Sequence, residues 1–471
     1  MVLPRRRPRP RALTALLPLL FLAALSLAAP GRDAAALTGS AKLSEAAGWL
    51  QGYLRLDTTN PPGNEGPAAD YLAGILARAG IPSQRIETPA RRASLWARLA
   101  APGSGGRAVL LLHHMDVVTP GPGWSVPPFS GLVKNGRLWG RGALDDKSLG
   151  IAQLAAVIDL ARHGGPRGRD VVFLAVADEE SGGGEGTGWL LAHRPELFAG
   201  VEAVVGEGGR NQVVNGRILW WGVEVAQKRP LWLAVEADGR GGHASSLNPA
   251  SAVHQLVVGL ARVLAIPQRW RVTTPARAYL KALAPYQNAH WRQVFTHIDG
   301  AIAETGPRTF LFPGMANLFL DTLQVTVLQA GERINVIPAA ARALIDVRLL
   351  PDTDGEAYRA AVARALGEGL DLKVVLTSPP AAPSPAAGRL YAALAKVLGA
   401  EAPVVPAMVP GFTDSRFFRA RGVAAYGVSP FALEAADSAG IHGVDERIPI
   451  AAFDRGVERL KRAVAAYAAR E

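Results

Sequence analysis

Three consecutive carboxylates, Asp178, Glu179 and Glu180, follow directly after the apolar run 171–177. This run contains β-branched residues and predicts a strand that is buried on both faces. Adjacent carboxylates at the end of a buried strand repel one another unless a cation or a proton lies among them. Open α/β sheets bind their ligands at this edge. The stretch therefore predicts a cation site, although an acidic loop in solvent would explain it equally well if it stood alone.

Other apolar runs end in residues of the same kind. His114 and Asp116 follow one such run, and Glu207 follows another. A carboxylate near an imidazole fixes the tautomer of the ring and raises its basicity, as a metal ligand requires. Asp145 lies in a glycine-containing loop, just before an apolar helix that is predicted to begin at about residue 148. We therefore assign Asp145 to the same chemistry.

Two neighbours of these residues are interpreted as structural. His113 alternates with His114 along the predicted strand, so it should face the opposite side of the sheet. Asp146 stands at the amino end of the predicted helix. A carboxylate at that position commonly caps the free backbone N–H groups of the first turn.

The predicted strands alternate with helices, and this order implies a parallel sheet whose carboxyl ends share one edge. The strand-ending residues should therefore meet.

The chain contains no cysteine, so disulfides and thiolate ligands are excluded and any metal must be held by histidines and carboxylates. A hydrophobic content of 49% with 19% charged residues indicates a globular protein. Five arginines near the amino end contribute to the net charge of +11, and the remaining basic residues are scattered with no aromatic-interleaved stripe, which argues against a nucleic-acid partner.

A change of pattern near residue 231 predicts a second, smaller domain. Its elements follow the order βαββαβ, which is typical of a small ferredoxin-like sheet with helices on one side. They are strand 231–237, helix 248–264, strands 323–328 and 343–349, helix 355–366 and strand 372–377. A long insertion rich in Trp, Tyr and Phe, at about residues 267–322, separates the first helix from the second strand.

Further polar residues lie in loops of both domains. His243 stands in the glycine-rich stretch 241–245, and Asn335 stands in a turn that ends at Pro338. After a proline-rich linker, Arg416 and His442 follow, and His442 supplies a second imidazole far from His114 in the sequence. A single histidine in a loop is usually only solvated, so none of these residues identifies a site when taken alone.

The first 29 residues predict export. Five arginines precede an apolar run from Ala12 to Ala29, and small residues near Ala28 offer a cleavage site. This is the pattern of a secretory signal peptide. An uncleaved membrane anchor is the alternative, although Pro18 and the modest length argue against a well-formed spanning helix. We expect a periplasmic or secreted protein, or a membrane-anchored one if the segment is retained.

Taken in order, the motifs of residues 43–471 resemble the di-zinc metallopeptidases that include aminoacylase, carboxypeptidase G and succinyl-diaminopimelate desuccinylase. The chain is most similar to the carboxypeptidase S branch, which includes secreted N-acyl amino acid hydrolases. Each motif is weak alone, but their order and spacing together are highly specific. The resemblance is carried by Asp57-Thr-Thr-Asn-Pro-Pro-Gly63, His114-Met-Asp-Val-Val118, Gly140-Arg-Gly-Ala-Leu-Asp-Asp-Lys147, Asp178-Glu-Glu180, Gly242-His-Ala-Ser245, Asn335-Val-Ile-Pro338, Thr413-Asp-Ser-Arg416 and His442-Gly-Val-Asp-Glu-Arg447.

The resemblance implies two zinc ions per chain, with Co²⁺ or Mn²⁺ as substitutes, and with Asp145 as the bridging ligand. One ion would also be held by His114 and Glu207, and the other by Glu180 and His442. Related sequences often have Asp-Glu-Gly around Glu207, whereas this chain has Gly206-Glu207-Gly208.

The resemblance also implies roles for the remaining site residues. Glu179 would be the general base, and Asp116 would orient His114. His243 would stabilise the oxyanion from its own subunit or from a neighbouring one. Asn335 and Arg416 would bind a free α-carboxylate, for which arginine offers a two-pronged donor.

The implied fold is α/β, with a mainly parallel sheet flanked by helices and an inserted ferredoxin-like lid and dimerisation domain. The expected boundaries are residues 1–29 for the signal peptide or anchor, residues 40–227 and 381–471 for the catalytic domain, and residues 228–380 for the lid.

The expected reaction is cleavage of an amide or peptide bond next to a free carboxylate, as in carboxypeptidase S. N-acyl amino acid hydrolysis is the alternative, with the aromatic insertion lining an acyl pocket or merely covering the lid. A catalytically silent metal-binding protein is a more remote alternative.

Overall fold

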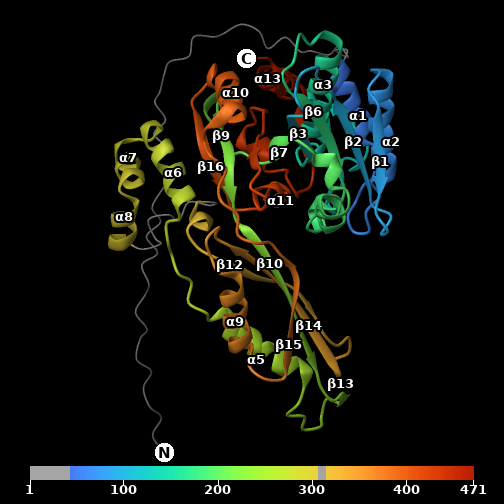
Figure 1. Ribbon diagram of the computed structural model, residues 1–471. Helices are drawn as coiled ribbons and strands as arrows, with labels where there is room; N and C mark the ends of the chain where they lie inside the picture. The colour runs from blue at the N-terminus through green and yellow to red at the C-terminus, as the bar shows by residue number, and fades with distance from the viewer. Residues whose placement is uncertain (1–42, 306–314, 471) are drawn as a thin grey trace, which may run out of the picture. The chain divides into compact units, whose positions relative to one another are not determined.

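The computed structural model describes residues 43–305 and 315–470 (Figure 1), so the predicted signal segment 1–29 lies outside the described residues. None of the helices in those two ranges is both long enough and apolar enough to cross a membrane. The described chain forms two main sheets, joined by strands and linkers, and most of its helices pack against the first.

The larger sheet has nine strands within the described residues, and its centre is parallel. The order across the sheet is β1 (Ser83–Glu87), β2 (Ala93–Leu99), β6 (Asp170–Val176), β3 (Ala108–His114), β7 (Val201–Gly206), β17 (Ala424–Gly427), β9 (Arg217–Gln227) and β16 (Val404–Val409), with β8 (Gln212–Val214) paired to β9. Strands β6, β3, β7 and β17 run parallel to one another, whereas β2 is antiparallel to both of its neighbours, β1 and β6. At the other side β9 is antiparallel to β17 and parallel to β16.

The central strands are continuously apolar because both of their faces are buried. In β3, Val109 and Leu111 belong to the core under one set of helices, whereas Leu110 and Leu112 belong to the core on the opposite face. This alternation is the two-residue period of a strand. The first face is covered by α1 (Glu45–Leu54), α2 (Gly66–Arg78), α3 (Lys147–His163), α10 (Gly388–Gly399) and α13 (Ile450–Ala468), and the second by α4 (Trp189–His193) and α11 (Ser415–Arg419).

The second sheet confirms the predicted ferredoxin-like order. Its four strands are antiparallel and lie in the order β12 (Thr322–Gln329), β14 (Ala340–Leu349), β10 (Arg229–Asp238) and β15 (Leu370–Thr377). Helices α5 (Ala252–Leu264) and α9 (Gly355–Leu366) pack against the sheet and bury a separate apolar core. A short two-stranded ribbon, β11 (Gly242–His243) and β13 (Val336–Ile337), carries the predicted lid residues.

The described helices of the aromatic insertion are α6 (Thr274–Leu283), α7 (Ala289–Thr296) and α8 (Ile298–Thr305). Their buried residues belong to the core of the larger sheet. Tyr279 packs edge-on against Trp220 of β9 at a centroid distance of 6.2 Å. The insertion therefore covers the β9–β16 side of the larger sheet, so the lid boundaries 228–380 enclose a segment that packs on the catalytic core.

A single residue, Lys228, separates β9 of the first sheet from β10 of the second. Figure 1 draws these two strands in green, one following the other. The side chain of Lys228 is fully buried at this junction. A third, small sheet joins β4 (Leu132–Lys134), β5 (Arg137–Trp139) and β18 (Arg447–Pro449), and it brings the loop after β5 next to the loop before β18. These junctions set the positions of the site residues.

Candidate metal centre

The five predicted metal ligands come from separate segments and meet at the carboxyl edge of the larger sheet. His114 is the last residue of β3, Glu207 follows β7, and Glu180 lies in a single helical turn after β6. Asp145 lies two positions before Lys147, the first residue of α3, and His442 lies in the loop before β18. The parallel central strands and the small sheet that contains β18 together bring these residues close to one another, although His114 and His442 are more than 300 positions apart in the sequence.

Asp145 lies between the two imidazoles. Its Oδ1 atom is 3.0 Å from Nε2 of His114, and its Oδ2 atom is 3.1 Å from Nε2 of His442. One carboxylate thus presents one oxygen to each histidine. This is the arrangement that a bridging ligand between two metal ions requires.

Each histidine has a second carboxylate nearby. Glu207 Oε1 lies 3.9 Å from Nε2 of His114, and Glu180 Oε2 lies 3.3 Å from Nε2 of His442. Burial raises the pKa of Glu180 and raises that of Glu207 well above its usual range, with the neighbouring acids acting in the same direction. Within the described residues, Oε1 of Glu180 has no hydrogen-bond partner. Two buried carboxylates beside imidazole nitrogens, one of them with an oxygen that has no partner among the described residues, are a donor set that zinc-class ions fit.

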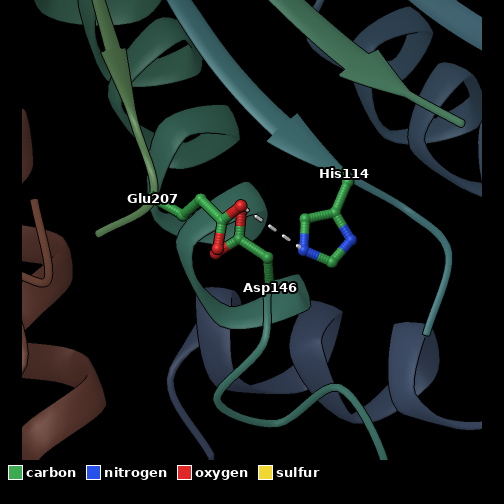
Figure 2. Close-up of side chains that lie close together, drawn as sticks. All are labelled: His114, Asp146 and Glu207. Atoms are coloured by element: carbon green, nitrogen blue, oxygen red, sulfur yellow. Dashed lines mark ion pairs between the residues drawn. The ribbon is translucent and has the colours of Figure 1, made fainter. Parts of the chain in front are cut away.

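Asp146 does not cap α3 as the sequence suggested. It occupies the N-cap position, but its side chain accepts no capping hydrogen bond, and its Oδ2 atom is buried without a partner among the described residues. Its carboxylate instead lies beside that of Glu207 and near His114, as Figure 2 shows. Sequence reasoning missed this placement because an acid before a helix matches the capping pattern so well.

Asp116 organises the site from behind the ligands. Nδ1 of His114 donates to the backbone carbonyl of Asp116 at 2.9 Å, which leaves Nε2 as the atom facing the other ligands. The Asp116 carboxylate lies 3.6 Å from the same nitrogen. It also accepts from the backbone N–H groups of Glu179 and Glu180, both at 3.1 Å, and from Asn60 at 2.7 Å. Asp116 therefore positions His114 and the Glu179–Glu180 turn together.

The three consecutive carboxylates have three different environments. Asp178 pairs with Arg92 at 2.7 Å and accepts a backbone hydrogen bond from Glu185, so it holds the turn. Glu180 faces His442, as described above. Glu179 lines a cavity beside the ligands, and its Oε1 atom is buried without a partner among the described residues. Burial raises the pKa of Glu179 well above its usual range, and the nearby Asp414 carboxylate acts in the same direction.

Glu446 holds the loop that carries Asp145. Its carboxylate is buried and accepts from Arg141 at 2.7 Å, and from the backbone N–H groups of Gly142, Leu144 and Asp145 at 2.9, 2.6 and 3.2 Å. The motif around His442 contains this residue, but sequence reasoning gave it no role.

The prediction that His113 faces the opposite side of the sheet from His114 is confirmed, because its buried ring packs near Phe173. Burial lowers the pKa of His113 to about 3.

A cavity of about 480 Å³ opens beside the metal centre and contains two cations that sequence reasoning missed. Arg348 pairs with Asp346 at 2.7 Å and stacks on Phe412 at 4.5 Å. Nζ of Lys228 donates to the carbonyl of Leu320 and to Oγ1 of Thr322, both at 3.0 Å, and has no salt-bridge partner in the described part of the chain. Burial lowers the pKa of Lys228 to about 8. Lys228 gave no signal in the sequence because its role depends on the junction between β9 and β10.

Three predicted site residues lie elsewhere. His243 and Asn335 are exposed on the β11–β13 ribbon and its adjoining loop, and no described contact joins them to the metal ligands. His243 makes its hydrogen bond with Ser245 at 2.7 Å. Arg416 is buried, donates to the carbonyls of Thr413 and Gly182, and stacks between Phe412 and Phe417. Its guanidinium is thus already bound to backbone carbonyls, and Lys228 and Arg348 are the cations that line the cavity.

Comparisons with known proteins agree with this architecture. The human (Homo sapiens) protein aminoacylase-1 is 27% identical over 428 residues, covering 88% of this chain and 93% of the relative. The Bos taurus N-fatty-acyl-amino acid synthase/hydrolase PM20D1 is 28% identical over 372 residues, covering 74% of this chain and 72% of the relative.

Solved structures show the same fold. The M20 family metallo-carboxypeptidase Sso-CP2 from Sulfolobus solfataricus superposes with a TM-score of 0.70 at 19% identity, over 90% of this chain and 99% of that one. A dinuclear metal-binding peptidase of the M20 family from Bacillus subtilis gives a TM-score of 0.53 at 13% identity, over 89% and 98%.

The family itself is identified by a model that spans most of the chain. The model of peptidase family M20/M25/M40 matches residues 110–466, a range that contains all five clustered ligands, the whole of the second sheet and most of the larger one. This match confirms the resemblance drawn from the motifs. The chain belongs to peptidase family M20/M25/M40 and is a metal-dependent hydrolase.

Proposed function

We propose that this enzyme hydrolyses the amide bond of N-acyl amino acids, next to a free carboxylate. The observation that carries the proposal is the shared cavity, which is lined both by metal ligands and by the cations Lys228 and Arg348. A substrate with its carboxylate near these cations would place its amide over Asp145 and Glu179. The names of the relatives aminoacylase-1 and PM20D1 support an acyl amino acid over a peptide. Cleavage of peptides in the manner of carboxypeptidase S stays a second prediction.

The proposed cofactor is a pair of zinc ions, for which Co²⁺ or Mn²⁺ could substitute. His114, Asp145 and Glu207 would hold one ion, and Asp145, Glu180 and His442 the other. Asp146, which lies beside Glu207, is a further donor near the first ion. Ions bound here would supply Lewis acidity toward the amide oxygen and would make a water molecule more acidic.

Glu179 is the proposed proton carrier. It removes a proton from the attacking water as the water oxygen bonds to the amide carbon. Glu179 then delivers that proton to the leaving nitrogen as the C–N bond breaks, which yields a carboxylate and a free amino acid.

Lys228 and Arg348 are proposed to bind the carboxylate of the substrate. Lys228 combines burial with the lack of a salt-bridge partner among the described residues, so a carboxylate would satisfy its charge. Asn335 and Arg416, the carboxylate-binding residues expected from the sequence, remain predictions. His243 would donate to the developing oxyanion, from its own chain after a movement or from a second copy in a homodimer formed through the smaller domain.

Export is proposed from the sequence of residues 1–29. The arginines followed by an apolar run support a periplasmic or secreted location, or a membrane anchor if the segment is retained. Fractionation of cells that express the full chain, with the amino-terminal residue of the purified protein determined, tests both outcomes. Recovery of the full-length chain in the cytoplasmic fraction would contradict export.

The activity is tested with matched substrates on metal-loaded protein. N-acetyl and N-acyl amino acids, their carboxyl-amidated counterparts and unmodified dipeptides are incubated with the chelated enzyme before and after zinc is restored. We expect zinc-dependent release of the free amino acid and a strong loss of rate when the carboxyl group is amidated. Equal rates on the acid and the amide would contradict the assigned role of the cations. Two bound metals without turnover on any of these substrates would favour the catalytically silent alternative.

A further inference from the structure

A buried ion pair joins the two loops that carry Asp145 and His442. Arg141 lies in the first loop, between β5 and α3, and Glu446 lies in the second, just before β18. Nη1 of Arg141 donates to Oε2 of Glu446 at 2.7 Å, and the two side chains are only 1% and 0% exposed. Two segments that are about 300 residues apart in the sequence are thus held together by one arginine and one glutamate.

This pair also reaches the backbone next to each of the two ligands. Nη2 of Arg141 donates to the carbonyl of Gly443 at 2.8 Å, and Gly443 directly follows His442. On the other side, the Glu446 carboxylate accepts from three backbone N–H groups of the first loop, including that of Asp145 itself. The pair therefore fixes the main chain beside both ligands at once.

Of the ligands, His442 depends most on such a connection. The side chain of His114 is 1% exposed at the end of β3, and Glu207 directly follows β7. His442 lies outside any helix or strand, and its side chain is 53% exposed. Its φ of 57° lies in the left-handed region, which residues other than glycine seldom adopt. Packing holds this imidazole only loosely, so its position is set by the backbone that carries it.

The chemistry of the pair leaves little freedom for substitution. Each oxygen of the Glu446 carboxylate accepts two hydrogen bonds, and all four partners are N–H donors. An amide in its place would turn its own N–H₂ group toward some of these donors. The guanidinium of Arg141 is a planar fork whose two arms reach Glu446 and Gly443, and the single ammonium of a lysine cannot reproduce that geometry.

We infer that Arg141 and Glu446 are positioning residues that set the separation of Asp145 and His442. They thereby set the affinity for the ion that these two ligands share with Glu180. The inference rests on the proposed function, because it takes the centre to hold two ions. Neither residue is among the described residues that line the cavity beside the metal centre, so the pair acts through the ligands and not on the substrate.

The two ions should respond differently when the pair is broken. The first ion shares only Asp145 with the pair, because its other ligands, His114 and Glu207, follow strands of the larger sheet. The second ion depends on both tethered loops. Loss of the pair should therefore weaken the second ion more than the first.

The test measures metal affinity rather than activity. The full chain is freed of metal with a chelator and titrated with Zn²⁺ in competition with a chromophoric chelator, which resolves the two binding steps. Arg141→Lys keeps the charge and lacks the fork. It should bind the second ion about 10–100-fold more weakly than wild type, as is common when a residue behind a metal ligand is changed. Glu180→Gln and Glu207→Gln, titrated alongside, identify the ions, and Arg141→Lys should weaken the same ion as Glu180→Gln does.

A second variant and a matched control separate positioning from general stability. Glu446→Gln should weaken the same ion as Arg141→Lys, and Arg141→Lys decides if the glutamine variant does not fold. Arg459→Lys is the control, because Arg459 is a second buried arginine fork, 3% exposed on α13, that donates to Glu401 and to the carbonyl of Pro430. The control should lower the melting temperature of the metal-free protein and leave both zinc affinities unchanged.

The outcomes distinguish the inference from the proposed function. Wild-type affinity for both ions in the folded Arg141→Lys protein would overturn the positioning role and leave the proposed function standing. Equal weakening of the two ions, or a loss of affinity that Arg459→Lys reproduces, would show a structural role alone and would also overturn it. If the wild-type chain itself binds fewer than two zinc ions, the proposed two-ion centre fails.

Discussion

At the carboxyl edge of the larger sheet, His114, Asp145 and Glu207 are held within hydrogen-bonding or near-contact distances by elements that are mostly buried. On the ribbon of the smaller sheet, His243 and Asn335 are exposed and have no described contact with that edge. Both groups of residues were expected to serve one reaction. The difference shows that the chain pre-assembles the metal ligands on its own. We propose that the lid residues reach them through a movement or from a second copy. The predictions below test this contrast, beginning with the largest effect.

The bridging aspartate should be the most sensitive position. Asp145→Ala should remove both metals and abolish measurable turnover, because one carboxylate faces both histidines. Metal content is measured by elemental analysis on the same preparation that is assayed. Asp159→Ala, a partly exposed acid on α3, is the control and should keep both metals. Two tightly bound metals in the Asp145 variant would rule out the bridging role.

Glu179 and Glu180 should separate catalysis from metal binding. Glu179→Gln keeps the shape of the side chain but cannot carry a proton, so kcat should fall by about 10²–10⁴ with both metals retained. Glu180→Gln should weaken one metal and lose activity by that route, because Glu180 lies next to His442. The base assignment is wrong if the Glu179 variant is nearly as active as wild type or loses metal as readily as the Glu180 variant.

His243 should affect turnover and leave the metal centre intact. His243→Ala removes an oxyanion donor and should lower kcat by about 10²–10³ without changing metal content. Mixing this variant with Glu179→Gln distinguishes the two routes to the site. Activity recovered on mixing means that the histidine acts on the site of a second copy, and no recovery means that it acts within its own chain. Wild-type turnover in the single variant would remove His243 from the mechanism.

Lys228 should produce the smallest effect and a characteristic pH dependence. Burial lowers its pKa to about 8, so the ammonium is charged below that pH and becomes neutral above it. If it binds the substrate carboxylate, kcat/KM should fall as the pH rises through about 8. Lys228→Met should lose about 10–100-fold in kcat/KM at pH 7 and lack this alkaline limb. The carboxyl-amidated substrate provides the control, since its hydrolysis should not follow the titration of Lys228.

Much of the fold could be read from residue spacing. Strand β6 was predicted at 171–177 and lies at Asp170–Val176, and α9 was predicted at 355–366, which matches its observed bounds. Such elements are predictable because their apolar period directly reflects which faces are buried. The meeting of strand-ending acids and histidines also followed from topology, because parallel strands must share a carboxyl edge. Strands β9 and β16, whose patterns are less regular, were not predicted.

Residue types and spacing were therefore enough to predict a histidine and carboxylate centre at the edge of an α/β sheet. They were not enough to show that Asp146 lies beside Glu207 and does not cap α3, because an acid directly before a helix fits either role. Nor did they show that Lys228 lines the site whereas Arg416 is bound to backbone carbonyls. These assignments depend on which side chains meet once separate segments of the chain have packed together. Such contacts arise from packing between elements, and the local periods of a sequence carry no information about them.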